Sequence, residues 1–140
     1  NDGGDAFAED PVEVESSRPD FMVLAYPAIS MEGHVHQGCR QNLLGENPSA
    51  ETVEDVSNEK RVTPGTPPTF LVHSVQDASV SCEHSILFAQ ALRRAGVGFQ
   101  LHLLEQGRHG LGLGGRDAVW SVWPSLCAGW LRRRVEESVF

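Results

Sequence analysis

The sequence has little of what three common classes of protein need. Its cysteines are odd in number and widely spaced (Cys39, Cys82 and Cys127), which argues against a disulfide framework. The longest apolar runs are near strand length, far short of the roughly 20 residues that cross a bilayer, so we expect no membrane partner. The 11 basic residues face 19 acidic ones, a net charge of −8. We therefore expect no nucleic-acid partner, because phosphate binding requires a basic patch.

The composition is that of a globular protein. Hydrophobic residues make up 40% of the chain, which favours a packed core over a disordered chain. A chain of this length buries roughly two thirds of its unfolded surface. We therefore interpret residues 1–140 as a single domain. Residues 1–19 are polar and acidic, and we expect them to form an extended lead-in with one short helical turn.

Three apolar stretches have the length and composition of β-strands. Residues 21–26, 69–74 and 98–104 are bounded by prolines, glycines or polar segments. The run at residues 21–26 is continuous and closed by Pro27, which is typical of a strand that is buried on both faces of a parallel sheet. Residues 30–48 are rich in glycine, histidine and asparagine, and we expect them to form a loop.

Helical signals separate and follow these strands. Ser49 and Glu51 indicate a short acidic helix that ends near Ser57. Apolar residues at helical spacing continue from Cys82 until Gly96 stops the pattern. A final helix is predicted by apolar residues at i, i+3, i+4, i+7 and i+8, namely Trp123, Leu126, Cys127, Trp130 and Leu131. This spacing makes the tryptophans core residues rather than a carbohydrate platform. The alternation predicts an α/β fold with a parallel sheet and right-handed crossovers.

Polar residues of catalytic type follow two of the predicted strands. Asp77 comes shortly after residues 69–74, and His109 comes shortly after residues 98–104. Because ligands of parallel sheets bind beyond the carboxyl ends of the strands, we expect the two side chains to lie together. A carboxylate there would fix the tautomer of the imidazole and stabilise the imidazolium. Taken singly, Asp77 could hold a turn and His109 could be a loop residue. Together, acid before histidine is the order of a serine-hydrolase triad.

The segments around these residues resemble a known family. RPDFMVLAYPAISM, NLLGENPSAE, TPPTFLVHSVQDASV and EQGRHGLGL are similar to the carboxyl-terminal half of acetyl-xylan-esterase-like α/β hydrolases, with the resemblance running from about Asp5 to Arg134. The family acid in a D-x-x-V-P turn matches Asp77, and the family histidine in a G-x-H-G-F-G turn matches His109. The sequence departs from these motifs at Gln76, Ser81 and Leu111, none of which removes a catalytic group.

The resemblance implies a partial α/β-hydrolase fold that lacks the N-terminal half of the sheet. It also implies a serine esterase that acts on a small acyl ester or an acetylated carbohydrate and needs no cofactor. The nucleophile is missing, because no G-x-S-x-G turn occurs in the chain. Ser30 follows the first predicted strand and is the best candidate for the nucleophile among the serines that precede Asp77. No glycine-flanked turn surrounds it, so a loop serine that bonds nearby backbone is the plainer interpretation.

Two hypotheses follow from the missing nucleophile. In the first, the chain is an ester hydrolase whose serine comes from a complementing hydrolase half or from an unusual position. In the second, it is an inactive, truncated half-hydrolase. The strand at residues 21–26 would then have a bare edge, and a bare apolar edge favours pairing with another chain. The simplest product of such pairing is a homodimer.

Two further motifs suggest other chemistry. His34, His36 and Cys39 are zinc-ligand types, but a closed site needs four donors and no fourth is evident nearby. We therefore expect no metal. Residues 110–115 fit the pattern G-x-G-x-x-G, yet a nucleotide site also needs a following strand that ends in an acidic residue. The resemblance explains these glycines as the turn that shapes the histidine loop.

Overall fold

The computed structural model describes residues 5–138, so residues 1–4 of the predicted lead-in lie outside the described residues. Its sheet contains β1 (Met22–Ala25), β2 (Thr69–Ser74) and β3 (Phe99–Leu104). All three strands are parallel, in the order β1-β2-β3, which confirms the predicted sheet. The helices are α1 (Pro11–Val14), α2 (Gln37–Leu44), α3 (Ala50–Asp55), α4 (Glu83–Arg94) and α5 (Trp123–Ser138), with 3₁₀ turns η1 (Asn58–Lys60) and η2 (Trp120–Val122).

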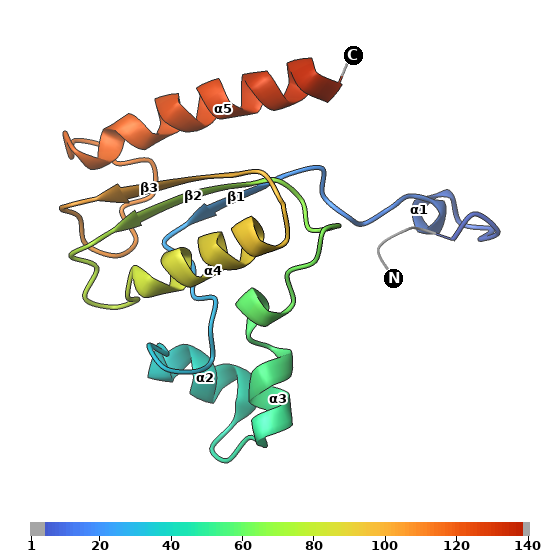
Figure 1. The fold of residues 1–140 in the computed structure, drawn as a ribbon, viewed down its shortest axis with the longest axis horizontal. Helices are drawn as coiled ribbons and strands as arrows, with labels where there is room; N and C mark the ends of the chain where they lie inside the picture. The colour runs from blue at the N-terminus through green and yellow to red at the C-terminus, as the bar shows by residue number, and fades with distance from the viewer. Residues whose placement is uncertain (1–4, 139–140) are drawn as a thin grey trace.

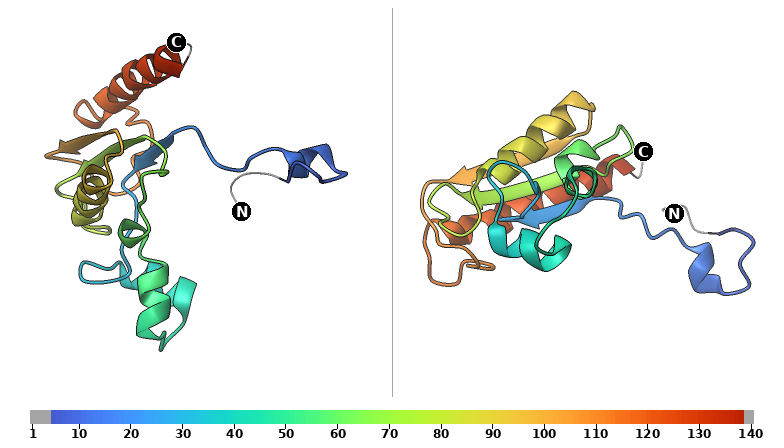
Figure 2. Two further views of the ribbon diagram at one scale, coloured as in Figure 1. Left: turned by 45° about the vertical axis from the view of Figure 1, so that its right-hand side comes forward. Right: turned by 90° about the horizontal axis from the view of Figure 1, so that it is seen from below.

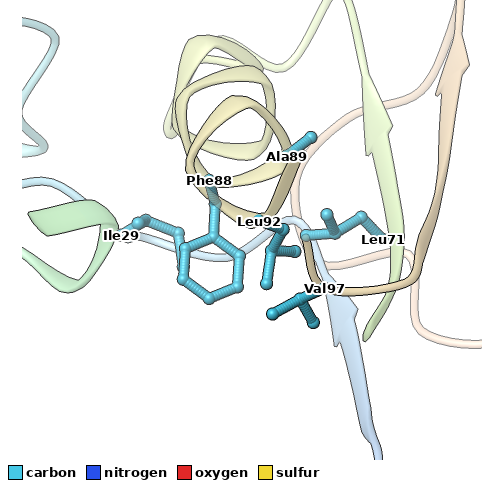
Figure 3. Packing of buried hydrophobic residues seen from close by; sticks show 6 residues of the cluster. All are labelled: Ile29, Leu71, Phe88, Ala89, Leu92 and Val97. Atoms are coloured by element: carbon cyan, nitrogen blue, oxygen red, sulfur yellow. The ribbon is translucent and has the colours of Figure 1, made fainter. Parts of the chain in front are cut away.

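Helices cover both faces of the sheet, with α4 on one side and α5 on the other (Figure 1). Because successive side chains of a strand point to opposite faces, β2 supplies both cores. Leu71 packs toward α4 in a cluster that Figure 3 shows, made of Ile29, Leu71, Phe88, Ala89, Leu92 and Val97. The second cluster contains Phe70, Val72, Trp120, Trp123, Cys127 and Trp130. Every residue of β2 is buried, as is typical of the central strand of a parallel sheet that is covered on both faces.

The predicted helix boundaries have clear local causes. Ser49 caps α3, since its Oγ accepts a hydrogen bond from the backbone N–H of Thr52 at 3.1 Å. After α4, Gly96 takes a left-handed backbone with φ +73°, a conformation that suits glycine and ends a helix. These two helices are confirmed where the sequence placed them.

Two local predictions were wrong. Residues 30–48 contain helix α2, whose N-cap is His36; its Nδ1 accepts a hydrogen bond from the N–H of Cys39 at 3.0 Å. Histidine is not a usual cap, and no residue of α2 is buried, so neither a cap signal nor an apolar stripe marked the helix. Strand β1 is not buried on both faces, because Val23 is 39% exposed.

Residues 5–20 extend away from the sheet and carry α1 (Figure 2). No residue of α1 is buried. None of the helices in the described residues is both long enough and apolar enough to cross a bilayer.

Candidate active site

Asp77 and His109 meet at the edge of the sheet where β2 and β3 end. The Nδ1 atom of His109 lies 2.7 Å from Oδ2 of Asp77. The Asp77 side chain is 1% exposed, whereas the His109 side chain is 36% exposed. The pair therefore consists of a buried acid and an imidazole that solvent or a substrate can reach.

The loop after β2 is built around the Asp77 carboxylate. Oδ1 accepts hydrogen bonds from the backbone N–H groups of Ser79 at 2.9 Å and Val80 at 3.0 Å, the pattern of an Asx turn. Burial by itself would raise the pKa of Asp77. The N–H of Val80, the His109 imidazole and the N–H of Ser79 outweigh burial and hold that pKa below its usual range. Asp77 is therefore an ionised carboxylate at neutral pH.

This contact fixes the tautomer of His109. An ionised carboxylate can only accept hydrogen bonds, so Nδ1 of His109 carries the proton that lies between the two side chains. The neutral imidazole then has its lone pair on Nε2, which makes no hydrogen bond within residues 5–138. His109 is thus arranged to take up a proton at Nε2 while Asp77 stabilises the resulting imidazolium.

A second histidine, His73, lies beside the Asp77 carboxylate. It is fully buried, and its Nε2 lies 2.9 Å from the carbonyl oxygen of Val80 and 3.4 Å from Oδ2 of Asp77. Because a carbonyl only accepts, Nε2 carries the proton, and Nδ1 accepts from the hydroxyl of Ser85 at 2.8 Å. Burial lowers the pKa of His73, consistent with a neutral ring. The sequence indicated a structural strand residue but gave no sign that His73 joins β2, α4 and the acid loop.

The loop that carries His109 is fixed at Gly112. The carbonyl oxygen of Gly112 accepts hydrogen bonds from Nε1 of Trp120 at 2.8 Å and Nε1 of Trp123 at 3.0 Å. Its N–H donates to the hydroxyl of Tyr26 at 3.2 Å. The sequence did not single out Tyr26; the one available signal was that the single tyrosine of the chain is the last residue of a predicted strand.

The other sequence candidates lie elsewhere or do other work. Ser30 is 2% exposed, and its hydroxyl bonds the backbone of Glu32 rather than His109. His36 caps α2, and no group of three potential metal ligands occurs among residues 5–138. Within residues 110–115, Gly114 has φ +93° and a Cβ there would lie 2.6 Å from the Ser121 nitrogen, so this glycine is required by close backbone packing.

The buried histidines predict that acid weakens the fold. Burial lowers the pKa of His73 and of His84, so below about pH 6.5 the unfolded chain binds more protons than the folded one. The free energy of unfolding is therefore expected to fall as the pH drops from 7.5 to 5. Protonation of Asp77, whose pKa is also lowered, adds to the loss at still lower pH. Urea unfolding at each pH measures this dependence.

Two variants provide the comparison for that titration. His73→Gln removes one buried titrating group, so its stability should change less with pH. His84→Gln removes the other buried ring and should likewise reduce the change of stability with pH. Equal stability at pH 7.5 and pH 5 would show that the buried rings are not the titrating groups.

Residues 23–131 match the prolyl oligopeptidase family. Endo-1,4-beta-xylanase B from Butyrivibrio fibrisolvens is 38% identical over 108 residues, which cover 77% of this chain and 17% of that protein.

Two solved structures are similar to this chain over about half of their own length. An acetyl ester-xyloside bifunctional hydrolase from Caldicellulosiruptor lactoaceticus has a TM-score of 0.90 and 46% identity, covering 94% of this chain and 48% of that chain. A sugar hydrolase from Lactococcus lactis has a TM-score of 0.72 and 27% identity, covering 93% and 52%. These findings confirm the predicted family resemblance. They also agree with a partial α/β-hydrolase fold.

Proposed function

Because the chain belongs to the prolyl oligopeptidase family of α/β hydrolases, we propose that it is a carboxylic ester hydrolase with Asp77 as acid and His109 as base. The observation that carries this proposal is the 2.7 Å contact between His109 Nδ1 and Asp77 Oδ2. A buried, ionised acid behind a reachable imidazole is the arrangement that general-base catalysis requires.

The mechanism is acyl transfer through a serine. His109 Nε2 takes the proton of the serine hydroxyl as the serine oxygen attacks the ester carbonyl, and Asp77 stabilises the imidazolium. The bond to the alcohol then breaks, and His109 returns the proton to the departing oxygen. In the second half, His109 takes a proton from water as the water oxygen attacks the acyl carbonyl. The bond to the serine oxygen then breaks, and His109 returns the proton to the serine. The serine would come from a complementing hydrolase half or from an unusual position in this chain, since no G-x-S-x-G turn is present.

Small acyl esters and acetylated carbohydrates are the proposed substrates. Two similar proteins support this choice by name, one a hydrolase of acetyl esters and xylosides and the other a xylanase. No metal or cofactor is needed for this mechanism, because an imidazole and a serine supply the proton transfer and the nucleophile.

The test uses p-nitrophenyl acetate, an ester reactive enough to report on an imidazole even without a strong nucleophile. We expect the purified chain to hydrolyse it, and His109→Ala to reduce the rate by about 10²-fold or more, the usual contribution of a general base. Absorbance of p-nitrophenol gives the rate, and a fluorophosphonate label followed by mass spectrometry identifies any reactive serine.

Three controls make this assay specific. The urea-unfolded chain gives the background from free histidines, and His34→Ala alters an exposed histidine outside the Asp77–His109 pair. The matched amide, p-nitroacetanilide, should resist hydrolysis, which separates ester from peptide chemistry. Equal ester hydrolysis by the native chain and His109→Ala would refute the proposed role of His109.

The exposed edge of β1 favours a second candidate function, that of an inactive half-hydrolase that self-associates. This strand pairs with β2 on one side and with no strand of residues 5–138 on the other, while Phe21 and Val23 are 37% and 39% exposed. An apolar groove of about 340 Å³, lined in part by Met22 and Leu24, lies beside it. We propose that an inactive form would pair here as a homodimer. Absence of His109-dependent hydrolysis, together with a dimer by light scattering, would favour this candidate over the enzyme.

A further inference from the structure

Tyr26 has a backbone conformation that its residue type disfavours. Its φ is +42°, and among residues 5–138 it is the one non-glycine residue with positive φ. Bulky residues rarely adopt this region, and such outliers gather at functional sites where the surrounding structure enforces them. The position therefore calls for an explanation beyond ordinary packing.

The surrounding contacts hold Tyr26 in place from both ends. Its backbone N–H donates to the carbonyl oxygen of Val72 at 2.8 Å, which extends the pairing of β1 with β2 by one residue. At the tip of the side chain, the hydroxyl accepts the N–H of Gly112 at 3.2 Å. The side chain thus spans from the end of β1 to the loop that carries His109.

The Tyr26 ring lies against the imidazole itself. The ring centroids of Tyr26 and His109 are 4.8 Å apart with an interplanar angle of 64°, an edge contact. The centroid of the Tyr26 ring also lies 5.7 Å from that of Trp120, a residue of the core. Aromatic pairs prefer this edge geometry to a face-to-face stack. His109 is therefore held at Nδ1 by Asp77 and along its ring by Tyr26.

We infer that Tyr26 is a positioning residue whose ring fixes the plane of the His109 imidazole and so directs Nε2 toward the ester. Asp77 alone holds one atom and leaves the ring free to swing about the hydrogen bond. The Tyr26 ring restricts that motion because it is itself held against Trp120, which is fully buried. The consequence for catalysis rests on the proposed role of His109 as base.

The test measures the His109 ring directly and needs no turnover. Nuclear magnetic resonance of ¹⁵N-labelled chain can follow the Nδ1–H proton that lies between His109 and Asp77. Tyr26→Asn removes the ring but keeps a residue that tolerates positive φ. We expect this proton to exchange with water about tenfold faster in Tyr26→Asn, the scale of one lost aromatic pair.

Two matched variants separate positioning from general loosening. Tyr26→Phe keeps the ring and removes the hydroxyl, so exchange should stay within about twofold of the wild type. Val23→Asn changes a partly exposed residue of β1, the strand that Tyr26 directly follows, and should leave the exchange of the His109 proton unchanged. Unchanged exchange in folded Tyr26→Asn, or about tenfold faster exchange in Tyr26→Phe, would overturn the inference.

These outcomes are independent of the ester assay. Fast exchange in Tyr26→Asn with no His109-dependent hydrolysis would support the positioning role of Tyr26 and contradict the proposed ester hydrolase function. His109-dependent hydrolysis by the wild type, with unchanged exchange of the His109 proton in Tyr26→Asn, would support the hydrolase function and contradict the role of Tyr26. If both hold, the hydrolysis rate of Tyr26→Asn should fall through kcat with little change in KM, since the substituted residue orients the base rather than binding the ester.

Discussion

Replacing Trp120 with alanine is expected to lower the free energy of unfolding by about 3–5 kcal/mol, the usual cost of removing a buried aromatic side chain. Trp120 is fully buried and packs with Phe70 and Val72 between the sheet and α5. Its removal leaves a cavity and also withdraws the Nε1–H group that donates to Gly112 at 2.8 Å. Urea unfolding followed by circular dichroism measures the change.

Trp120→Phe separates the packing effect from the hydrogen bond. Phenylalanine keeps much of the apolar area, and the Gly112 carbonyl still accepts from Trp123 Nε1 at 3.0 Å. We therefore expect a loss of about 1–2 kcal/mol. Val119→Ala, at a 41% exposed neighbour, should change stability by less than about 0.5 kcal/mol. A cost below about 1 kcal/mol for Trp120→Ala would mean that the second cluster is not a stabilising core.

Replacing Asp77 with alanine is expected to cost about 3 kcal/mol, because several donors lose a charged acceptor at once. The N–H groups of Ser79 and Val80, and the ring N–H of His109, all donate to this carboxylate. The Val80 N–H is buried with it and would have no replacement acceptor of equal strength. The free energy of unfolding from urea titration again provides the measurement.

Asp77→Asn is the informative companion. Its Oδ1 can still accept from Ser79 and Val80, whereas its amide N–H₂ would face the N–H of His109 and the N–H of His73. We expect a smaller loss, about 1–2 kcal/mol, and a switch of the His109 tautomer that the ring nitrogen shifts in a magnetic resonance spectrum would reveal. Gln76→Ala, at an exposed position in the same loop, is the control. Equal stability of Asp77→Ala and the wild type would show that the loop does not depend on the carboxylate.

The sequence was sufficient to predict the sheet and the position of the two polar residues. β2 is buried along its whole length, and the apolar residues Phe70, Leu71 and Val72 at its centre, with prolines just before it, are typical of a buried strand. Parallel pairing then carries Asp77 and His109 to one edge, because both follow neighbouring strands. α2 was missed for the opposite reason: an entirely unburied helix with a histidine cap leaves no periodic or capping pattern to detect.

The supporting residues around the dyad could not be predicted from the sequence. Tyr26 reaches Gly112 across 86 positions of the chain, and no local pattern reports a contact of that range. The backbone strain at Tyr26 is likewise a product of tertiary structure, since tyrosine has no preference for positive φ. His73 was predicted to be a structural residue of a strand, and it does lie in β2. Its second role depends on where α4 places Ser85.

The hydrogen bonds from tryptophan to Gly112 give the chain an intrinsic optical probe. Two of the three tryptophans end on that one carbonyl oxygen, and indole emission responds to the polarity around the ring and to its hydrogen bonding. Intrinsic fluorescence therefore reports on the histidine loop as well as on the hydrophobic interior. Any ligand that shifts the loop would register in the emission spectrum without an added dye.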